Sequence, residues 1–240
     1  MGALLLALSL SWTGVTFAQS SPVGVINSFS GSVSILHQDG SSINAKIGAK
    51  LSVADIVKTG DDGLAKIIMQ DQNIFMLNED SELILKEYPL KGTSKGSTTL
   101  ETKGDLHLKI NQRYNDEDSS FRLITSSAVA GVKGTEFAVA DREGQTQITT
   151  LEGKVEVGEK MQGRKIQNPV SLEKGLQISA NRNGVDRQSI KHLSASELAG
   201  VKAHSLRTKS NVKSHSNKKP GPGMNNNNEE SKKPQKRSRH

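Results

Sequence analysis

The chain has 240 residues and no cysteine, which excludes disulfides and thiol chemistry, and only 3% of its residues are aromatic. Its core must therefore consist mainly of Val, Ile and Leu, and the β-branched members of this set favour strands. The formal net charge of +7 is unevenly distributed, because residues 205–240 contain ten Lys and Arg against two Glu, a net charge of +8. The remaining 204 residues carry a net charge of −1, which argues against a basic domain face that reads nucleic acid.

The N-terminus has the pattern of a secretory signal peptide. Residues 3–10 are apolar and uncharged, and Thr16-Phe17-Ala18 precedes a polar Gln-Ser-Ser run. We therefore expect residues 1–18 to be a signal peptide cleaved after Ala18, and the protein to be periplasmic, secreted or at the cell surface. The apolar run is shorter than the roughly 20 residues of a membrane-spanning helix. A short hydrophobic anchor that stays attached is the alternative.

From residue 22 to about residue 180 the hydrophobic pattern has a period of two, which predicts β-strands. Val33 and Ile35 alternate with serines and lead to Asp39-Gly40, a strong hairpin signal. Further strands are expected, in chain order, at residues 64–69, 74–77, 83–85, 106–110, 121–125, 136–140, 146–151 and 154–157. Gly, Asn or Asp separates most of them, and no helical pattern intervenes. The sequence therefore predicts an all-β domain over residues 22–180, either a two-sheet sandwich or a short β-solenoid.

The pattern changes after residue 180, where we expect a linker, residues 181–204, that contains one short helix. Ser194 and Glu197 have the spacing of a capping box, and Leu198 and Val201 would share one helical face. Residues 205–240 contain almost no apolar side chains, so we expect a disordered basic tail.

The tail has two interpretations, since it either contacts envelope polyanions or only increases solubility. Its charges are clustered near the end of the chain. The residues expected to contact polyanions are Lys218, Lys219, Lys232, Lys233, Lys236, Arg237 and Arg239.

The most specific segment of the chain is residues 128–139, which read Ala-Val-Ala-Gly-Val-Lys-Gly-Thr-Glu-Phe-Ala-Val. It resembles the hallmark of the FecR domain family, in which an Ala-Gly-Val-Arg-Gly-Thr-x-Phe type of motif precedes a strand. Ala54 stands where the family pattern has Gly, and Asp71-Gln72-Asn73 stands at its Asp-Gly-Ser turn. The resemblance covers roughly residues 22–180. The other segments that are similar to the family pattern, in the same order, are residues 31–35 (expected as the opening strand), 54–60, 65–77, 152–157 and 172–177.

The residues of this motif have structural explanations. Gly131 and Gly134 indicate a close approach or a positive φ that a Cβ would not allow. Thr135 is expected to hydrogen-bond the local backbone, and Phe137 to fill the core. Glu136 alternates outward from Phe137, and no His or second carboxylate is beside it in the sequence, so we assign it no catalytic role.

No pattern in the sequence supports catalysis or cofactor binding. The six His residues lack the spacing of metal ligands, and the acidic turns at residues 78–80 and 116–118 lack the alternating carboxylates of a calcium loop. A nucleophile elbow and a phosphate-binding Gly loop are both missing. We therefore expect no enzymatic activity, no metal site and no cofactor.

The family resemblance implies two possible functions. FecR proteins of the regulatory type have a cytoplasmic domain that binds a sigma factor, one transmembrane helix and this β domain in the periplasm. This sequence resembles instead the stand-alone exported type, whose β domain would act as a binding or scaffold module for an envelope protein or glycan. The alternative is a periplasmic component of transmembrane signalling that takes part in sigma-factor regulation through a separate membrane partner.

Overall fold

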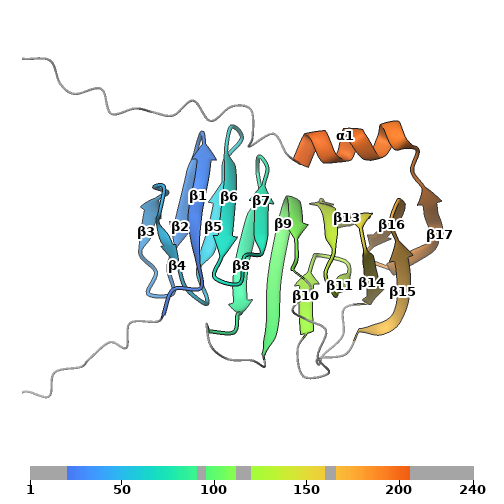
Figure 1. Ribbon diagram of the computed structural model, residues 1–240, viewed down its shortest axis with the longest axis horizontal. Coiled ribbons are helices and arrows are strands. Elements are labelled where there is room, and N and C mark those ends of the chain that lie inside the picture. The colour runs from blue at the N-terminus through green and yellow to red at the C-terminus, as the bar shows by residue number, and fades with distance from the viewer. Residues whose placement is uncertain (1–20, 91–95, 112–119, 160–165, 206–240) are drawn as a thin grey trace, which may run out of the picture.

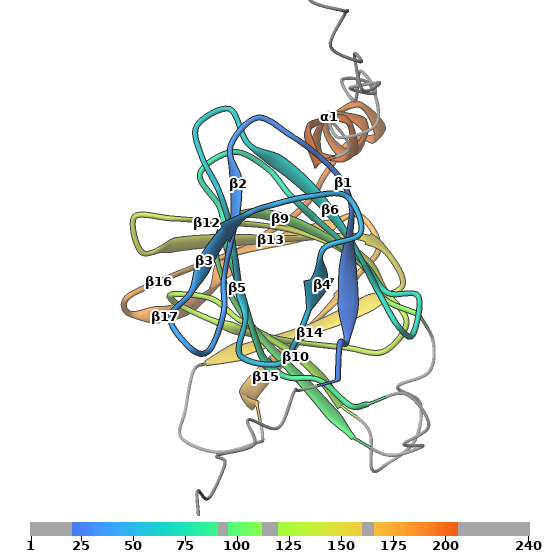
Figure 2. The same ribbon diagram turned by 90° about the vertical axis from the view of Figure 1, so that its left-hand side faces the viewer.

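The computed structural model describes residues 21–90, 96–111, 120–159 and 166–205, which form seventeen strands and one helix. The strands are arranged in two layers, and helix α1 (Ala195–Ser205) lies over one of them (Figure 1) (Figure 2). We call the layer beneath α1 the helix-side sheet and the other layer the opposite sheet. The expected signal peptide and basic tail lie outside the described residues.

Each sheet runs the length of the molecule, and the chain alternates between them as it advances (Figure 1). Neighbouring strands are antiparallel except β9 and β10, which are parallel. The helix-side sheet has the order β4 (Lys50–Leu51), β1 (Gly24–Ser30), β6 (Leu64–Met69), β7 (Ile74–Leu77), β9 (Ser97–Lys109), β12 (Glu136–Arg142), β13 (Gln145–Glu152), β16 (Leu176–Asn181) and β17 (Gly184–His192). The opposite sheet has the order β3 (Ser42–Asn44), β2 (Val33–Leu36), β5 (Ile56–Thr59), β8 (Glu82–Glu87), β9, β10 (Ser120–Ile124), β11 (Val129–Val132), β14 (Lys154–Glu159) and β15 (Gln167–Glu173).

Strand β9 belongs to both sheets and joins the two layers. Its first half, up to Lys103, lies between β8 and β10 in the opposite sheet. Its second half, from Gly104, lies between β12 and β7 in the helix-side sheet. Gly104 has a φ of 83°, and a Cβ at this position would lie 2.7 Å from the carbonyl oxygen of Asp80. Glycine is therefore required at the point where the strand passes from one layer to the other.

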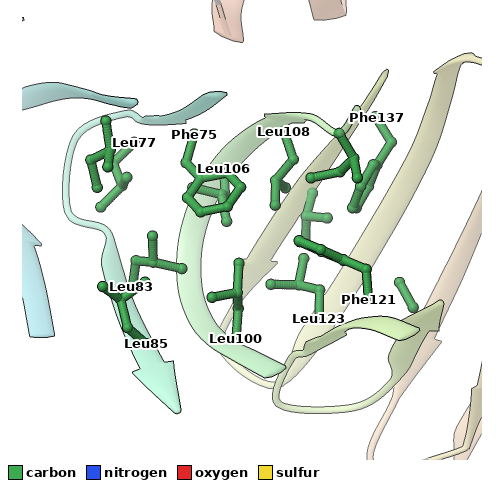
Figure 3. Close-up of a cluster of buried hydrophobic side chains, with 14 of the residues drawn as sticks. Phe75, Leu77, Leu83, Leu85, Leu100, Leu106, Leu108, Phe121, Leu123 and Phe137 are labelled. Carbon is green, nitrogen blue, oxygen red and sulfur yellow. The ribbon is translucent and has the colours of Figure 1, made fainter. Parts of the chain in front are cut away.

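Alternate side chains of the two sheets fill the space between them (Figure 3). The ring of Phe75 on β7 faces the ring of Phe121 on β10, with centroids 6.3 Å apart and planes tilted by 60°. Such tilted pairs stabilise a core by about 0.5–1.5 kcal/mol beyond the burial of their area. Fully buried leucines from β7, β8, β9 and β10 surround this pair: Leu77, Leu83, Leu85, Leu100, Leu108 and Leu123.

The predicted all-β class is confirmed, and the strands of both layers belong to one continuous hydrogen-bonded sheet. The Asp39-Gly40 hairpin is confirmed as well, because the His37 N–H donates to the carbonyl of Ser41 at 2.8 Å and Gly40 has a φ of 83°. The segment 31–35, expected as the opening strand, contains the second strand, because β1 precedes it. The alternating burial of β1 is interrupted by a register shift between Ile26 and Ser28.

The segment that we expected to be a linker, residues 181–204, begins with another strand. Strand β17 pairs with β16 across a turn at Gly184, which has a φ of 106°. Most side chains of β17 are exposed or polar, because it is the edge strand of its sheet, so no alternation of apolar residues marks it in the sequence. The β domain therefore continues to His192.

The expected short helix forms, and its N-terminus has the predicted capping box. The Ser194 N–H donates to Glu197 Oε2 at 2.7 Å, and the Glu197 N–H donates to Ser194 Oγ at 3.3 Å. The Ser194 hydroxyl hydrogen bond is the largest cause that lowers the pKa of the Glu197 carboxyl. Among the described residues, no helix is long and apolar enough to span a membrane.

Candidate functional site

The two glycines of the 128–139 motif differ in their backbone conformation and in what a Cβ would meet. Gly134 adopts a φ of 63°, a left-handed conformation that disfavours residues with a Cβ. Gly131 lies on β11, where a Cβ would approach Cδ1 of Ile166 to 2.6 Å. The positive φ therefore favours glycine at Gly134, whereas at Gly131 a Cβ would meet only the movable end of the Ile166 side chain.

The other two motif residues link the sheets. Phe137 on β12 is fully buried in the core, as expected. The Thr135 hydroxyl donates to the carbonyl oxygen of Lys154 on β14 at 2.8 Å, so its partner is a distant strand and not the local backbone that we expected. The four motif residues stabilise the fold at the junction of β11, β12 and β14 and do not form one pocket.

The outward-facing residue of the motif, Glu136, has neighbours that are remote in sequence. Its Oε1 lies 3.0 Å from Nε2 of His107 on β9 and 3.5 Å from Nζ of Lys202 on α1. The His107 side chain is completely buried. Burial lowers the pKa of the His107 imidazole, and the Glu136 carboxylate opposes this shift. The three side chains form a polar cluster between the sheet and the helix, in which Lys202 is half-exposed.

A second polar cluster lies one step along the same face. The Asp105 carboxylate accepts two hydrogen bonds from the Arg142 guanidinium, from Nε at 3.0 Å and from Nη2 at 3.1 Å. Hydrogen bonding to Asp105 is the main cause that raises the pKa of Arg142. Nε2 of His204 on α1 lies 3.1 Å from Asp105 Oδ2. Asn78 Nδ2 donates to the carbonyl oxygen of His204 at 3.3 Å.

Between α1 and the helix-side sheet lies a groove of about 290 Å³. Its floor consists of outward-facing residues in two rows across the strands. In one row Ala138 pairs with Thr149, which pairs with Gln177, and in the other row Ala140 pairs with Gln147. The full lining is Asn78, Asp105, Leu106, Ala138, Val139, Ala140, Gln147, Thr149, Gln177, Gly200, Val201 and His204. Small side chains on β12 thus leave a channel between polar side chains on either side.

No single segment of the sequence marks this face. The alternation of Leu106, His107 and Leu108, and of Glu136 and Phe137, indicates that His107 and Glu136 face outward, but not that β9 and β12 are neighbours. The pairing of Ala138 with His107 depends on contacts across about thirty residues of chain. The expected polyanion-binding lysines and arginines of the tail, residues 218–239, lie outside the described residues.

The titratable groups of this face are paired with one another. Within the described part of the chain, no group of three His, Asp or Glu residues is placed to hold a metal ion. His107 and Glu136 are buried under Lys202 and do not line the groove, so a substrate in the groove would not contact them.

Comparison with protein families matches residues 55–156 to the family described as FecR protein. No curated protein matches this chain. Two crystal structures, both described as a putative anti-sigma factor from Parabacteroides distasonis ATCC 8503, are similar at 19% and 21% identity with a TM-score of 0.47 each. Each alignment covers 60% of this chain and 62% of the solved chain. The family match lies inside the range inferred from the motifs, and it confirms the similarity to the FecR family over residues 55–156.

Proposed function

We propose that this protein is a non-enzymatic, exported envelope protein whose FecR domain binds another protein through the outer face of the helix-side sheet. The observation that carries this proposal is the groove beneath α1, whose polar floor already holds a peptide segment through side-chain contacts. The apolar N-terminal segment that precedes Ala18 supports export, and an exported protein would present this face in the periplasm, at the cell surface or outside the cell.

A protein partner fits this face better than a glycan. Glycan sites usually offer the ring of a Trp, Tyr or Phe on which a sugar stacks, and none of these residues lines the groove. The charged groups at its edge, Asp105 and Glu136, are paired here with side chains of a helix. A glycan or scaffold role remains the alternative within the same class.

The second candidate function is transmembrane signalling, and the FecR domain itself favours it. In this case the partner on the helix-side sheet would be a membrane protein that transmits the signal to a sigma-factor system. The two candidates use the same face and differ in the identity of the partner.

Site-specific photo-crosslinking in the producing cell tests the proposal. A crosslinker at Gln147, an exposed residue of the groove, is expected to capture a discrete envelope protein. The matched control is Ser171, which is exposed on β15 of the opposite sheet. Equal capture at both positions, or capture at neither, contradicts a binding face on the helix-side sheet.

The absence of enzymatic activity is tested separately. Purified protein is incubated with cell-wall glycan, and released reducing ends are measured for the wild type and for Glu136→Gln. We expect no release by either form. Release by the wild type that the variant abolishes would replace the binding proposal with a glycan hydrolase.

A further inference from the structure

We propose that α1 is an internal occupant of this docking face, and that the partner is a protein that presents a basic helical segment and displaces α1. This inference rests on the proposed protein-binding function and specifies the partner. Four features of the contact between α1 and the sheet support it.

The first feature is that α1 is held mainly through polar contacts near its C-terminal end. Lys202 reaches Glu136 at 3.5 Å, His204 reaches Asp105 at 3.1 Å, and the His204 carbonyl accepts from Asn78 at 3.3 Å. Lys202 and His204 have side-chain exposures of 53% and 48%, and ion pairs this exposed contribute little to stability. Leu198 and Val201 are only half-buried.

The second feature is that the helix fits the face incompletely. A groove of about 290 Å³ remains beneath it, and a Cβ added at Gly200 would meet nothing within 4 Å. Asn78 is 1% exposed, yet its Oδ1 has no hydrogen-bond donor among the described residues. A buried acceptor without a donor disfavours the docked state. A segment with larger side chains and a donor at this point would fit the face better than α1.

The third feature is that both carboxylates keep a partner when α1 leaves. Glu136 retains His107 at 3.0 Å, and Asp105 retains the two hydrogen bonds from Arg142. Release therefore leaves neither acidic group buried and unpaired, which would otherwise be costly. Lys202 and His204 are therefore a second pair of partners for these carboxylates, which cations of another segment can replace. The face would thus favour a segment that carries Lys, Arg or His.

The fourth feature is the connection between α1 and the sheet. Leu193, which follows β17, is buried, and its N–H donates to the carbonyl of Gly175 at 2.9 Å. The capping box of Ser194 and Glu197 lies within the helix itself. The helix can thus move as a unit after Leu193 without unpairing β17 and without losing its N-terminal cap.

A peptide with the sequence of residues 194–205 tests this proposal, because it presents the same cations in trans. Its binding to the full chain is measured by fluorescence anisotropy, for the wild type and for Lys202→Ala/His204→Ala. If α1 occupies the face more than about 90% of the time, releasing it is expected to increase the apparent affinity for the peptide by about 10-fold or more. A matched control, Lys58→Ala/Lys86→Ala, removes two half-exposed cations of the opposite sheet and is expected to bind the peptide as the wild type does.

Two further measurements make the result decisive. Asp105→Asn/Glu136→Gln in the released background is expected to weaken peptide binding, with a β-type circular dichroism spectrum and a melting transition retained. A scrambled peptide of the same composition is expected to bind at least about 10-fold more weakly. Equal affinity of the wild type and the Lys202→Ala/His204→Ala variant, or equal binding of the scrambled peptide, overturns the proposal.

The outcome separates this inference from the proposed function. If the peptide fails in trans while the crosslinker at Gln147 still captures a protein, the face binds a partner but α1 is a permanent part of it, and the displacement proposal is wrong. If both fail, the binding face itself is wrong.

Discussion

Glu136 Oε1 lies 3.0 Å from Nε2 of His107, and both side chains are buried on the outer face of the helix-side sheet. The two residues are 29 positions apart in the chain and meet because β9 and β12 are neighbours. The FecR motif thus contributes to both faces of β12, with Phe137 directed into the core and Glu136 directed toward α1.

The buried imidazole makes stability depend on pH. Burial lowers the pKa of His107 in the folded state, whereas the same group in the unfolded chain titrates near 6.5. The unfolded state therefore binds more protons just below pH 6.5, and stability falls as the pH drops through this window toward the folded pKa. For one group the slope is at most about 1.4 kcal/mol per pH unit.

We expect His107→Gln, which cannot titrate, to lose less stability than the wild type between pH 7.5 and pH 5.5. The measurement is the urea midpoint of each form at both pH values. An identical loss in the two forms would show that other groups cause the acid sensitivity of the fold.

Ala54 adopts a φ of 72° where the family pattern has Gly, and its N–H is fixed by a hydrogen bond of 2.7 Å to the carbonyl of Leu85. A left-handed conformation costs an L-residue about 1–2 kcal/mol, a cost that Gly avoids. Gly in turn destabilises the fold by about 0.5–1 kcal/mol, because it makes the unfolded chain more flexible. We therefore expect Ala54→Gly to raise the free energy of unfolding by about 0.5–1 kcal/mol. The control Ala49→Gly, at a residue whose φ is not positive, should lower it.

Gly134, with a φ of 63°, should tolerate no β-branched residue. Gly134→Val is expected to destabilise the domain by about 1–3 kcal/mol, measured by urea denaturation. Gly134→Asn should cost less, because Asn adopts the left-handed conformation more readily. If both variants unfold at the wild-type midpoint, the left-handed backbone conformation is not the reason why this position is Gly.

The basic tail should bind polyanions through charge alone. Residues 205–240 carry a net charge of +8, whereas the rest of the chain is nearly neutral. Binding of the tail to duplex DNA or lipopolysaccharide should therefore weaken steeply as the salt concentration rises. We expect release well before about 0.5 M salt, where the Debye length is only a few Å. A chain that ends at Ser205 should bind neither ligand at low salt. Retained affinity in that shortened chain would place the polyanion site on the β domain.

The regular alternation of Val, Ile and Leu was sufficient to predict the all-β class and the positions of nine of the seventeen strands, because most of these strands bury every second side chain. The capping box of Ser194 and Glu197 also predicted α1 correctly, since a helix cap depends on residues three apart. The edge strand β17 was missed because its side chains are mostly exposed and leave no apolar pattern. The partner of Thr135 was misassigned because it lies on β14.

What the sequence determined by itself is local: which residues form strands, which side of each strand is apolar, and where glycine is needed in the motif. Only the tertiary structure decided which strands are neighbours, and therefore that His107 meets Glu136 and that Asp105 meets both Arg142 and His204. The physical reason is that strand pairing joins segments far apart in the chain, and that it depends on the burial of the whole core rather than on any one segment. The groove beneath α1 depends entirely on that choice, since its floor comes from β9, β12, β13 and β16 and its roof from a helix that follows them in the chain.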